Sequence, residues 1–410
     1  MVTRRLPAMA LAAVLVAGGC SSTPEAVTVG AVYPTGGAHG SGGMEEYHGV
    51  ELAAELANRE GGVNGRPIRL DLIPSDSVDG TGPAVRALAD RGARVILGTY
   101  GSTLSTVAAR VALERDVILW ETGAVGEMPA EVASGGRFFR VAPSGGTLGT
   151  AAVAFVRERL LPRIEAAPAA PRYSVLYVDD EYGRGVARGA LEEIARGGEP
   201  LAVDLAYDPH AFDPDALARR VAGARTDVLV VVAYLDDGVA VRRALVRNRV
   251  PLVASIGTSS SYCHPQFGEA LGRDAVGLFA SDKPDGDALK AEALEPDAAR
   301  RLRWARDAYR ERFGHAMPAA ALAGFAGAWA LFHHVLPSAE DLSASGVAAA
   351  ALAARVESGG LPNGSGLAFA EGGVNVRASS VVWEWVAPRQ REIVWPPAFA
   401  TSPLIALPLR

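Results

Sequence analysis

The sequence has few cysteines and no excess of positive charge. Only two cysteines occur among its 410 residues, at positions 20 and 263, so no disulfide framework can hold the fold. The 46 acidic residues outnumber the 40 basic ones, and the net charge of −6 offers no basic surface for a nucleic acid. Apolar residues make up 49% and charged residues 21%, which excludes intrinsic disorder and indicates a large packed core.

Catalytic and cofactor motifs are also missing. The sequence contains no G-x-S-x-G nucleophile elbow, no H-E-x-x-H or C-x-x-C pair and no P-loop. Residues 257–261 (GTSSS) lack the closing glycine of an elbow, and the seven histidines are scattered. We therefore expect no catalytic residue, no metal or other cofactor, and a protein that is not an enzyme.

The first twenty residues predict an export signal. Two arginines precede an apolar run over 6–17, and small residues follow up to Cys20. This order is typical of a secretory signal, and a cysteine directly after the small residues resembles a bacterial lipobox. We predict a signal peptide over 1–19, lipidation at Cys20 and a linker over 20–26. The alternative is an ordinary signal peptide in which the cysteine is incidental.

No later segment offers eighteen apolar residues without charge. Residues 316–336 come closest, but Pro318 and the pair His333-His334 favour a buried helix. We therefore expect an exported protein that is lipid-anchored at the bacterial cell membrane, in the periplasm or at the cell surface, and does not span the membrane.

From residue 27 onward, short β-branched runs alternate with alanine-rich amphipathic stretches, and the rhythm restarts after Pro143. The helices expected include one over 102–114. Longer helices follow Pro284, a further helix is expected over 344–358, and a β-hairpin is expected over 380–395. This alternation predicts βαβ units with parallel sheets, and hence an α/β protein of two lobes. The predicted strands cover 27–32, 69–73, 95–97, 117–120, 138–141, 173–178, 203–206, 228–232, 252–255 and 277–280.

Strand-to-helix junctions rich in small hydroxyl residues are the best candidates for binding. Residues 99–103 (TYGST) follow a strand and open a helix, so two hydroxyls and free backbone N–H groups would meet there and suit a carboxylate. Alternatively, Ser102 is only a helix cap. The glycine-rich segment 36–43 fits no phosphate motif and is expected to be a flexible loop, and the acids at 179–181 are expected to be solvated.

Several motifs occur in a fixed order between residues 27 and 395: VGAV at 29–32, GVELA at 49–53, NREGGVNG at 58–65, DEYGRG at 180–185 and WPP at 395–397. With them the chain resembles the type I periplasmic solute-binding proteins of ABC importers, the leucine/isoleucine/valine-binding group. The resemblance implies two doubly wound lobes with a ligand cleft between them, joined by three crossovers near Pro143, 281–284 and 377–379. The implied division is lobe 1 over 27–143 and 284–377, lobe 2 over 144–283 and 378–398, and a C-terminal tail over 399–410.

The resemblance also implies how an amino-acid ligand is held. The ligand's carboxylate would meet Ser102 and Thr103, and its other polar atoms the neighbouring loop. Lobe 2 would close on the ligand with two tyrosines. The remaining residues implied are Gly123, Ala124 and Val125 on the loop, Tyr182 and Tyr234 in lobe 2, His39 at the rim and Thr258 at a strand end. Val125 replaces a hydroxyl residue of the family, so one hydrogen bond is lost there.

The counter-charge of the ligand's ammonium is not where the family has it. The family's acid follows the strand predicted over 252–255, but this chain has IGTS at 256–259. A buried ammonium without an opposite charge is unfavourable. Either Glu121 or Asp236 supplies the charge, or the ligand is not an α-amino acid. Glu121 could instead pair with a framework arginine, and Cys263 would be a lone buried thiol.

These expectations define a function. The resemblance implies a monomeric binding protein that captures a branched-chain or other amino acid, or an amino-acid-like compound, by hinge closure and delivers it to an ABC transporter permease. The alternatives are a ligand-sensing domain with a separate signalling partner and an extracytoplasmic hydrolase.

Overall fold

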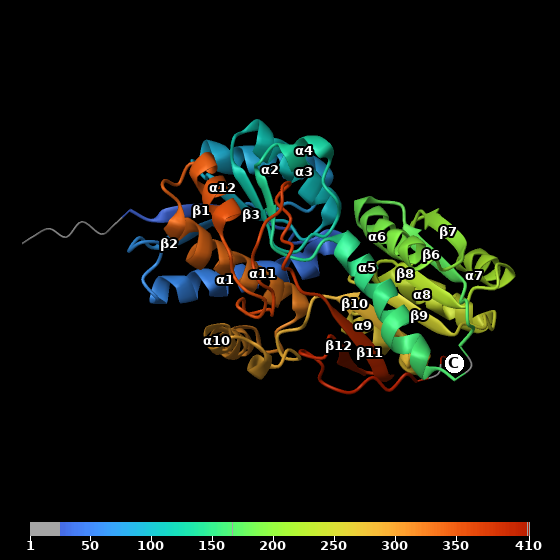
Figure 1. Cartoon of the computed structure of the whole chain (residues 1–410). Coiled ribbons are helices and arrows are strands. Elements are labelled where there is room, and N and C mark those ends of the chain that lie inside the picture. The colour runs from blue at the N-terminus through green and yellow to red at the C-terminus, as the bar shows by residue number, and fades with distance from the viewer. Residues whose placement is uncertain (1–24, 166, 408, 410) are drawn as a thin grey trace, which may run out of the picture.

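The computed structural model describes residues 25–165, 167–407 and 409, and these form two β-sheets in two lobes (Figure 1). Lobe 1 is built on a five-stranded parallel sheet with the strand order β2-β1-β3-β4-β5. Lobe 2 is built on a seven-stranded sheet with the order β12-β11-β10-β9-β8-β6-β7, in which β11 and β12 run antiparallel. The predicted signal peptide and Cys20 lie outside the described residues.

The strands follow from short apolar runs. The five residues of β8 are all buried, as expected for a central parallel strand covered on both faces. The first-lobe strands are β1 (Val27–Val32), β2 (Ile68–Leu72), β3 (Val95–Gly98), β4 (Ile118–Glu121) and β5 (Phe138–Arg140). The second-lobe strands are β6 (Tyr173–Val178), β7 (Leu201–Tyr207), β8 (Val228–Val232), β9 (Ala254–Thr258), β10 (Phe279–Asp282), β11 (Val381–Ala387) and β12 (Gln390–Trp395).

The helices connect and cover these strands, which confirms the predicted α/β fold of two doubly wound lobes. Lobe 1 contains α1 (Gly40–Arg59), α2 (Val78–Asp90), α3 (Ser102–Glu114), α4 (Ala130–Ser134), α10 (Pro296–Phe313), α11 (Ala319–Trp329) and α12 (Ala344–Ala353). Lobe 2 contains α5 (Gly145–Phe155), α6 (Glu181–Gly197), α7 (Pro214–Gly223), α8 (Leu235–Arg247) and α9 (Pro265–Leu271).

The chain passes between the lobes three times. It leaves the first sheet after β5 and enters α5, which packs on α6 in lobe 2 (Figure 1). It returns after β10 to α10 and α11, and it crosses again between α12 and β11. Because lobe 1 is assembled from two distant parts of the chain, the lobes can rotate about the connecting segments without either sheet breaking.

Helix α11 is a core helix of lobe 1. Its continuation to Ser338 is long and apolar enough to span a membrane, but 78% of the apolar window is buried inside the protein. It packs against α1 so closely that a Cβ atom on Gly49 would lie 1.9 Å from the carbonyl oxygen of Ala321. Glycine is therefore required at position 49, and the apolar surface of α11 is used for packing within the protein.

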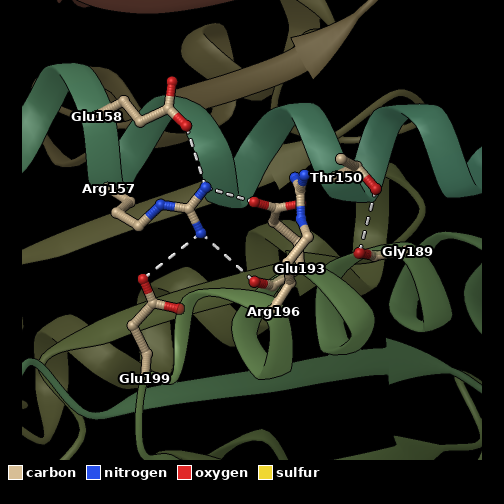
Figure 2. A network of polar contacts seen from close by, with 7 residues as sticks. All are labelled: Thr150, Arg157, Glu158, Gly189, Glu193, Arg196 and Glu199. Carbon is tan, nitrogen blue, oxygen red and sulfur yellow. Dashed lines mark hydrogen bonds and ion pairs between the residues drawn. The ribbon is translucent and has the colours of Figure 1, made fainter.

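A buried ion network stabilises lobe 2 (Figure 2). The carboxylate of Glu193 on α6 is 2% exposed and is paired with Arg157, at 2.5 Å, and with Arg196. Arg157 also reaches Glu199 at 3.6 Å and Glu158 at 3.0 Å. The network joins the C-terminal end of α6 to the helical turn that follows α5, and it leaves Glu193 fully compensated.

Two local predictions were wrong. The glycine-rich segment 36–43 is not a flexible loop, because it forms a short 3-10 turn and the first turn of α1. A Cβ atom on Gly43 would lie 2.4 Å from the carbonyl oxygen of Pro34, so glycine permits close contact here. The helix expected over 344–358 ends at Ala353, because Val356 instead pairs with Leu367 in an antiparallel bridge.

Candidate functional site

A cleft of about 720 Å³ lies between the lobes. It is lined by the segments that follow the carboxyl ends of β3 and β4 in lobe 1 and of β6, β8, β9 and β10 in lobe 2. Ligands of open α/β sheets bind at this end of the strands. Of the residues singled out in the sequence, six line the cleft: His39, Ser102, Gly123, Val125, Tyr182 and Tyr234.

Ser102 lines the cleft at the start of α3. It is the first residue of α3, and its Oγ accepts a hydrogen bond from the backbone N–H of Gly126 at 3.0 Å. The hydroxyl hydrogen then remains available to an acceptor in the cleft. The N–H groups of the first turn of α3 add partial positive charge, so this corner suits a carboxylate.

Thr103 does not line the cleft, and its contact with a ligand carboxylate stays a prediction. Its Oγ1 donates a hydrogen bond to the carboxylate of Glu181, at 2.7 Å, across the gap between α3 and α6. Asp180 caps the same helix by accepting from the N–H of Gly183 at 2.8 Å. The acids at 179–181 are therefore not merely solvated, since Glu181 bonds across the two lobes and Asp180 caps α6 within lobe 2.

Glu121 is hydrogen-bonded within the protein, and its contact with a ligand ammonium stays a prediction. The side chain is fully buried and does not line the cleft. Its carboxylate accepts hydrogen bonds from the N–H groups of Thr99 and Gly123, both at 2.9 Å, and of Ala124, at 2.8 Å. The hydroxyl of Ser105 donates to it as well. Its hydrogen-bond partners are mostly backbone groups, and the buried Arg140, its pair on the neighbouring strand β5, adds the framework arginine considered from the sequence.

The loop after β4 is fixed by this carboxylate. Ala124 is buried beneath the cleft surface, and its N–H is used by Glu121. The carbonyl oxygen of Gly123 accepts from Lys283 Nζ at 3.0 Å, so the hinge segment after β10 is tied to lobe 1. Val125 lines the cleft with an apolar side chain.

Aromatic side chains form a wall that passes from one lobe to the other. The ring of His39 lies 6.2 Å from that of Tyr100 in lobe 1 and 5.8 Å from that of Tyr234 in lobe 2. Tyr182 lies 5.4 Å from Tyr234. Burial lowers the pKa of His39, which favours the neutral ring. This wall suits an apolar or aromatic part of a ligand, and Tyr100 is a cleft residue that the sequence analysis did not assign.

Two further predicted residues lie outside the cleft lining. Thr258, fully buried at the end of β9, has its Oγ1 3.0 Å from the hydroxyl of Tyr182 and so positions that ring. Asp236 is exposed in the first turn of α8, and its contact with a ligand ammonium stays a prediction. The neighbouring Asp237 is the buried acid, and it accepts from the hydroxyl of Tyr207 at 2.5 Å.

Five acids line the cleft, namely Glu45, Glu269, Asp282, Asp285 and Asp287, and the buried one among them is Asp282, the last residue of β10. It is 5% exposed, and Cys263 Sγ lies 2.8 Å from its Oδ2. The same thiol contacts the backbone carbonyl of Ser259 after β9. The sequence signal was available, because Asp282 ends a strand as Glu121 does, but the segment 281–284 was interpreted only as a crossover.

The two cationic side chains at this corner, Arg391 and Lys283, each have a partner within the protein. Arg391 forms an ion pair with Asp285, and its guanidinium lies 4.4 Å from the ring centre of Trp383. Lys283 donates to the carbonyl of Gly123. The cleft is therefore completed by residues from β12 and from the segment after β10. No local sequence motif marks either segment.

The cleft shows no arrangement for nucleophilic catalysis at Cys263. Burial and the nearby Asp282 raise the pKa of this thiol well above its ordinary value, so it stays protonated. Among the described residues, no group of three or more His, Cys, Asp or Glu side chains could hold a metal ion. The cleft has a hydroxyl group at one corner, a carboxylate at another and an aromatic wall between them. Such a combination of polar and aromatic groups is typical of a binding site.

Comparisons with known proteins agree with this geometry. The model of a family described as periplasmic binding protein matches residues 26–382. Leu/Ile/Val-binding protein homolog 8 of Brucella abortus is 25% identical over 366 residues, covering 88% of each chain, and homolog 7 of Brucella suis is 24% identical, covering 93% of this chain and 94% of the relative.

Two solved structures share the fold. A leucine-binding protein of Thermotoga maritima superposes with a TM-score of 0.73 at 17% identity, covering 90% of this chain and 97% of that one. A branched-chain amino acid substrate-binding protein of Streptococcus pneumoniae, solved with isoleucine, gives 0.70 at 15% identity and covers 91% and 100%.

Proposed function

The chain belongs to the type I periplasmic binding protein family, in its Leu/Ile/Val-binding-like group, and from this premise we propose that it captures a small amino-acid-like ligand and delivers it to an ABC importer. The family consists of substrate-binding proteins rather than enzymes. The observation that carries the proposal is the cleft, because its polar and aromatic groups come from both lobes. A ligand that touches both lobes stabilises their closed arrangement.

The contacts across the cleft support closure as the means of capture. The hydrogen bond from Thr103 to Glu181 and the edge-to-face contact of His39 with Tyr234 exist only while the lobes lie together. In this closed arrangement Ser102 from lobe 1 and the tyrosines of lobe 2 surround one volume. The names of the relatives support an amino acid as the ligand class.

The experiment that tests this function is a thermal-shift screen of the purified protein. The panel contains the twenty L-amino acids, their amides and small carboxylic acids, and each hit is re-examined by mass spectrometry for chemical conversion. We expect at least one amino acid to raise the melting temperature without being converted, since a ligand at 100 times its Kd adds about 2.7 kcal/mol of stability. Conversion of every stabilising compound, or no stabilisation at all, would contradict the proposal.

We further propose that the protein is exported, lipid-anchored through Cys20 and monomeric. The support is the signal-like first nineteen residues and the cysteine that follows. We expect Cys20→Ser to release the mature protein from the membrane fraction and to abolish labelling by a radioactive fatty acid, with unchanged ligand binding. Continued labelling of the variant would contradict anchoring at this residue.

The two alternative functions are not favoured. A hydrolase needs an activated nucleophile, whereas the thiol in this cleft is held protonated. A sensor would use the same cleft, but the relatives include a transporter's substrate-binding protein. Transport of the ligand into vesicles that contain the cognate permease distinguishes delivery from sensing.

A further inference from the structure

We propose that Asp282 is the counter-charge for a primary ammonium group of the ligand. An acid at the end of β10 would thus do what the resemblance assigns to an acid after β9. This inference rests on the proposed function, since it requires a ligand in the cleft, and it narrows the ligand class to compounds that carry both an ammonium and a carboxylate.

The strand register places Asp282 where the missing acid would act. β9 and β10 are parallel neighbours, and Ser281 pairs with Thr258. Asp282 therefore lies beside Ser259, one strand spacing of about 4.8 Å away. The thiol of Cys263 touches both the carbonyl of Ser259 and the carboxylate of Asp282, so the two strand ends meet at one corner of the cleft.

The carboxylate of Asp282 lacks a full set of partners. Its Oδ2 is close only to a thiol, which is a weak donor, and its Oδ1 is buried with no hydrogen-bond partner among the described residues. Asp282 also forms no ion pair with any described residue, although its side chain is only 5% exposed. A buried carboxylate left in this state is unfavourable unless a cation or donor arrives with the ligand.

The nearest cations of the protein are engaged elsewhere. Lys283 Nζ donates to the carbonyl of Gly123, and Arg391 is paired with Asp285 while it stacks on Trp383. The indole N–H of Trp383, which also lines the cleft, is buried without an acceptor. This corner therefore combines one uncompensated negative charge with an aromatic surface, and a ligand ammonium would complete it.

The charge of Asp282 acts on the cleft residues of both lobes. Burial is the main cause that raises the pKa values of Tyr100 in lobe 1 and Tyr182 in lobe 2, and the charge of Asp282 adds to both. Ser102 offers its hydroxyl from lobe 1, and Asp282 its carboxylate from lobe 2. A zwitterion held at both corners would bridge the lobes and so favour closure.

The experiment compares an amino acid with its des-amino counterpart by isothermal titration calorimetry. L-Leucine and 4-methylpentanoate form the first pair, and any other L-amino acid that gives a thermal shift is paired in the same way. For Asp282→Asn we expect Kd for the amino acid to rise at least 100-fold and Kd for the des-amino acid to change less than threefold. The melting temperature of the unliganded variant should stay the same or rise, because a buried unpaired charge is removed.

Glu269→Gln is the matched control. Glu269 lines the same cleft but is exposed, so this variant removes the same unit of charge without removing a buried carboxylate. We expect less than a twofold change in either Kd. Equal losses for the amino acid and its des-amino counterpart in Asp282→Asn, or no loss in either, would overturn the inference and leave the proposed function intact.

A second variant keeps the test decisive if Asp282→Asn does not fold. Asp282→Glu retains the charge but moves the carboxylate by one methylene, and we expect at least a tenfold loss for the amino acid alone. If the wild-type protein binds only compounds without an ammonium, the inference fails while ligand capture stands. If it binds no compound of the panel, the proposed function itself fails.

Discussion

Glu121 and Asp282 are two buried acids at the ends of parallel strands, one in each lobe, and they differ in how their charge is satisfied. The carboxylate of Glu121 accepts three backbone N–H groups and a serine hydroxyl. That of Asp282 has a thiol at one oxygen and, within the described residues, nothing at the other. A strand-end acid that the protein satisfies by itself is part of the scaffold, whereas one that it leaves unsatisfied beside a cleft is available to a ligand.

The largest expected effect concerns stability. Glu121→Ala leaves three buried N–H groups without an acceptor, at about 1–3 kcal/mol each, so we expect the free energy of unfolding to fall by about 3 kcal/mol or more. Urea denaturation followed by circular dichroism measures this loss. Asp282→Asn, in parallel, should change the free energy of unfolding by less than about 1 kcal/mol. Equal losses in the two variants would remove the distinction between scaffold and binding acids.

A second prediction concerns Glu46, a fully buried acid close to Glu121. Burial and the charge of Glu121 raise the pKa of Glu46 to about 8, although Lys283 opposes this. The folded protein therefore holds a proton that the unfolded chain releases near pH 4.5, and the stability due to this group is lost as the pH rises towards 8.

We expect the wild-type free energy of unfolding to fall by about 3 to 4 kcal/mol more between pH 5 and pH 8 than that of Glu46→Gln. Denaturation curves of both proteins at these two pH values measure the difference. Parallel pH profiles of the two proteins would contradict a raised pKa at Glu46.

The third prediction concerns the carboxylate corner. Ser102→Ala removes a hydroxyl that can donate to a charged ligand, a bond worth about 1.5–3 kcal/mol, so we expect Kd to rise at least tenfold for the amino acid and for its des-amino counterpart alike. Calorimetry measures both, and Ser41→Ala, another cleft hydroxyl, is the control with less than a twofold change. Selective loss for the amino acid alone would mean that Ser102 meets the ammonium.

The smallest effect is expected at the contact between the lobes. Thr103→Val removes the hydrogen bond to Glu181, worth about 0.5–1.5 kcal/mol, and we expect a two- to fivefold weaker affinity through the closed state. Glu181→Gln should weaken the affinity by a similar factor, and the double variant should lose little more affinity than either single variant. A double-mutant cycle, measured by calorimetry on all four proteins, tests this expectation. A loss as large as that of Ser102→Ala would instead place Thr103 on the ligand.

The elements were largely predictable from the sequence. β1, β6 and β8 and helix α3 begin and end where the pattern predicts, because each depends on local apolar runs and a local change of period. The conformation of the glycine-rich segment 36–43 was not predictable, because its glycines allow close contacts with other backbone segments and do not make it flexible. Helix α12 was predicted too long for a similar reason, since a bridge to Leu367 competes with its last turn.

The candidate site divides in the same way. Ser102, Tyr182 and Tyr234 could be identified from a strand-to-helix junction and from the resemblance, and they line the cleft. Glu121 and Asp236 were assigned by their position after a strand or an aromatic residue, and neither reaches the cleft. The sequence does not tell which residues lie next to these side chains in space. For Glu121, one such neighbour, Thr99, is 22 residues away along the chain.

By itself the sequence determined the α/β elements, their division into two lobes and the family, because hydrophobic periodicity and ordered local motifs are properties of the chain. The tertiary structure alone decided which buried acids are satisfied. Donors for Glu121 come from the ends of two neighbouring strands, whereas the hydrogen-bond partner of Asp282 among the described residues is the thiol of Cys263. A carboxylate has the same chemistry in both places, and its role follows from the donors and cations that the fold brings within hydrogen-bonding distance.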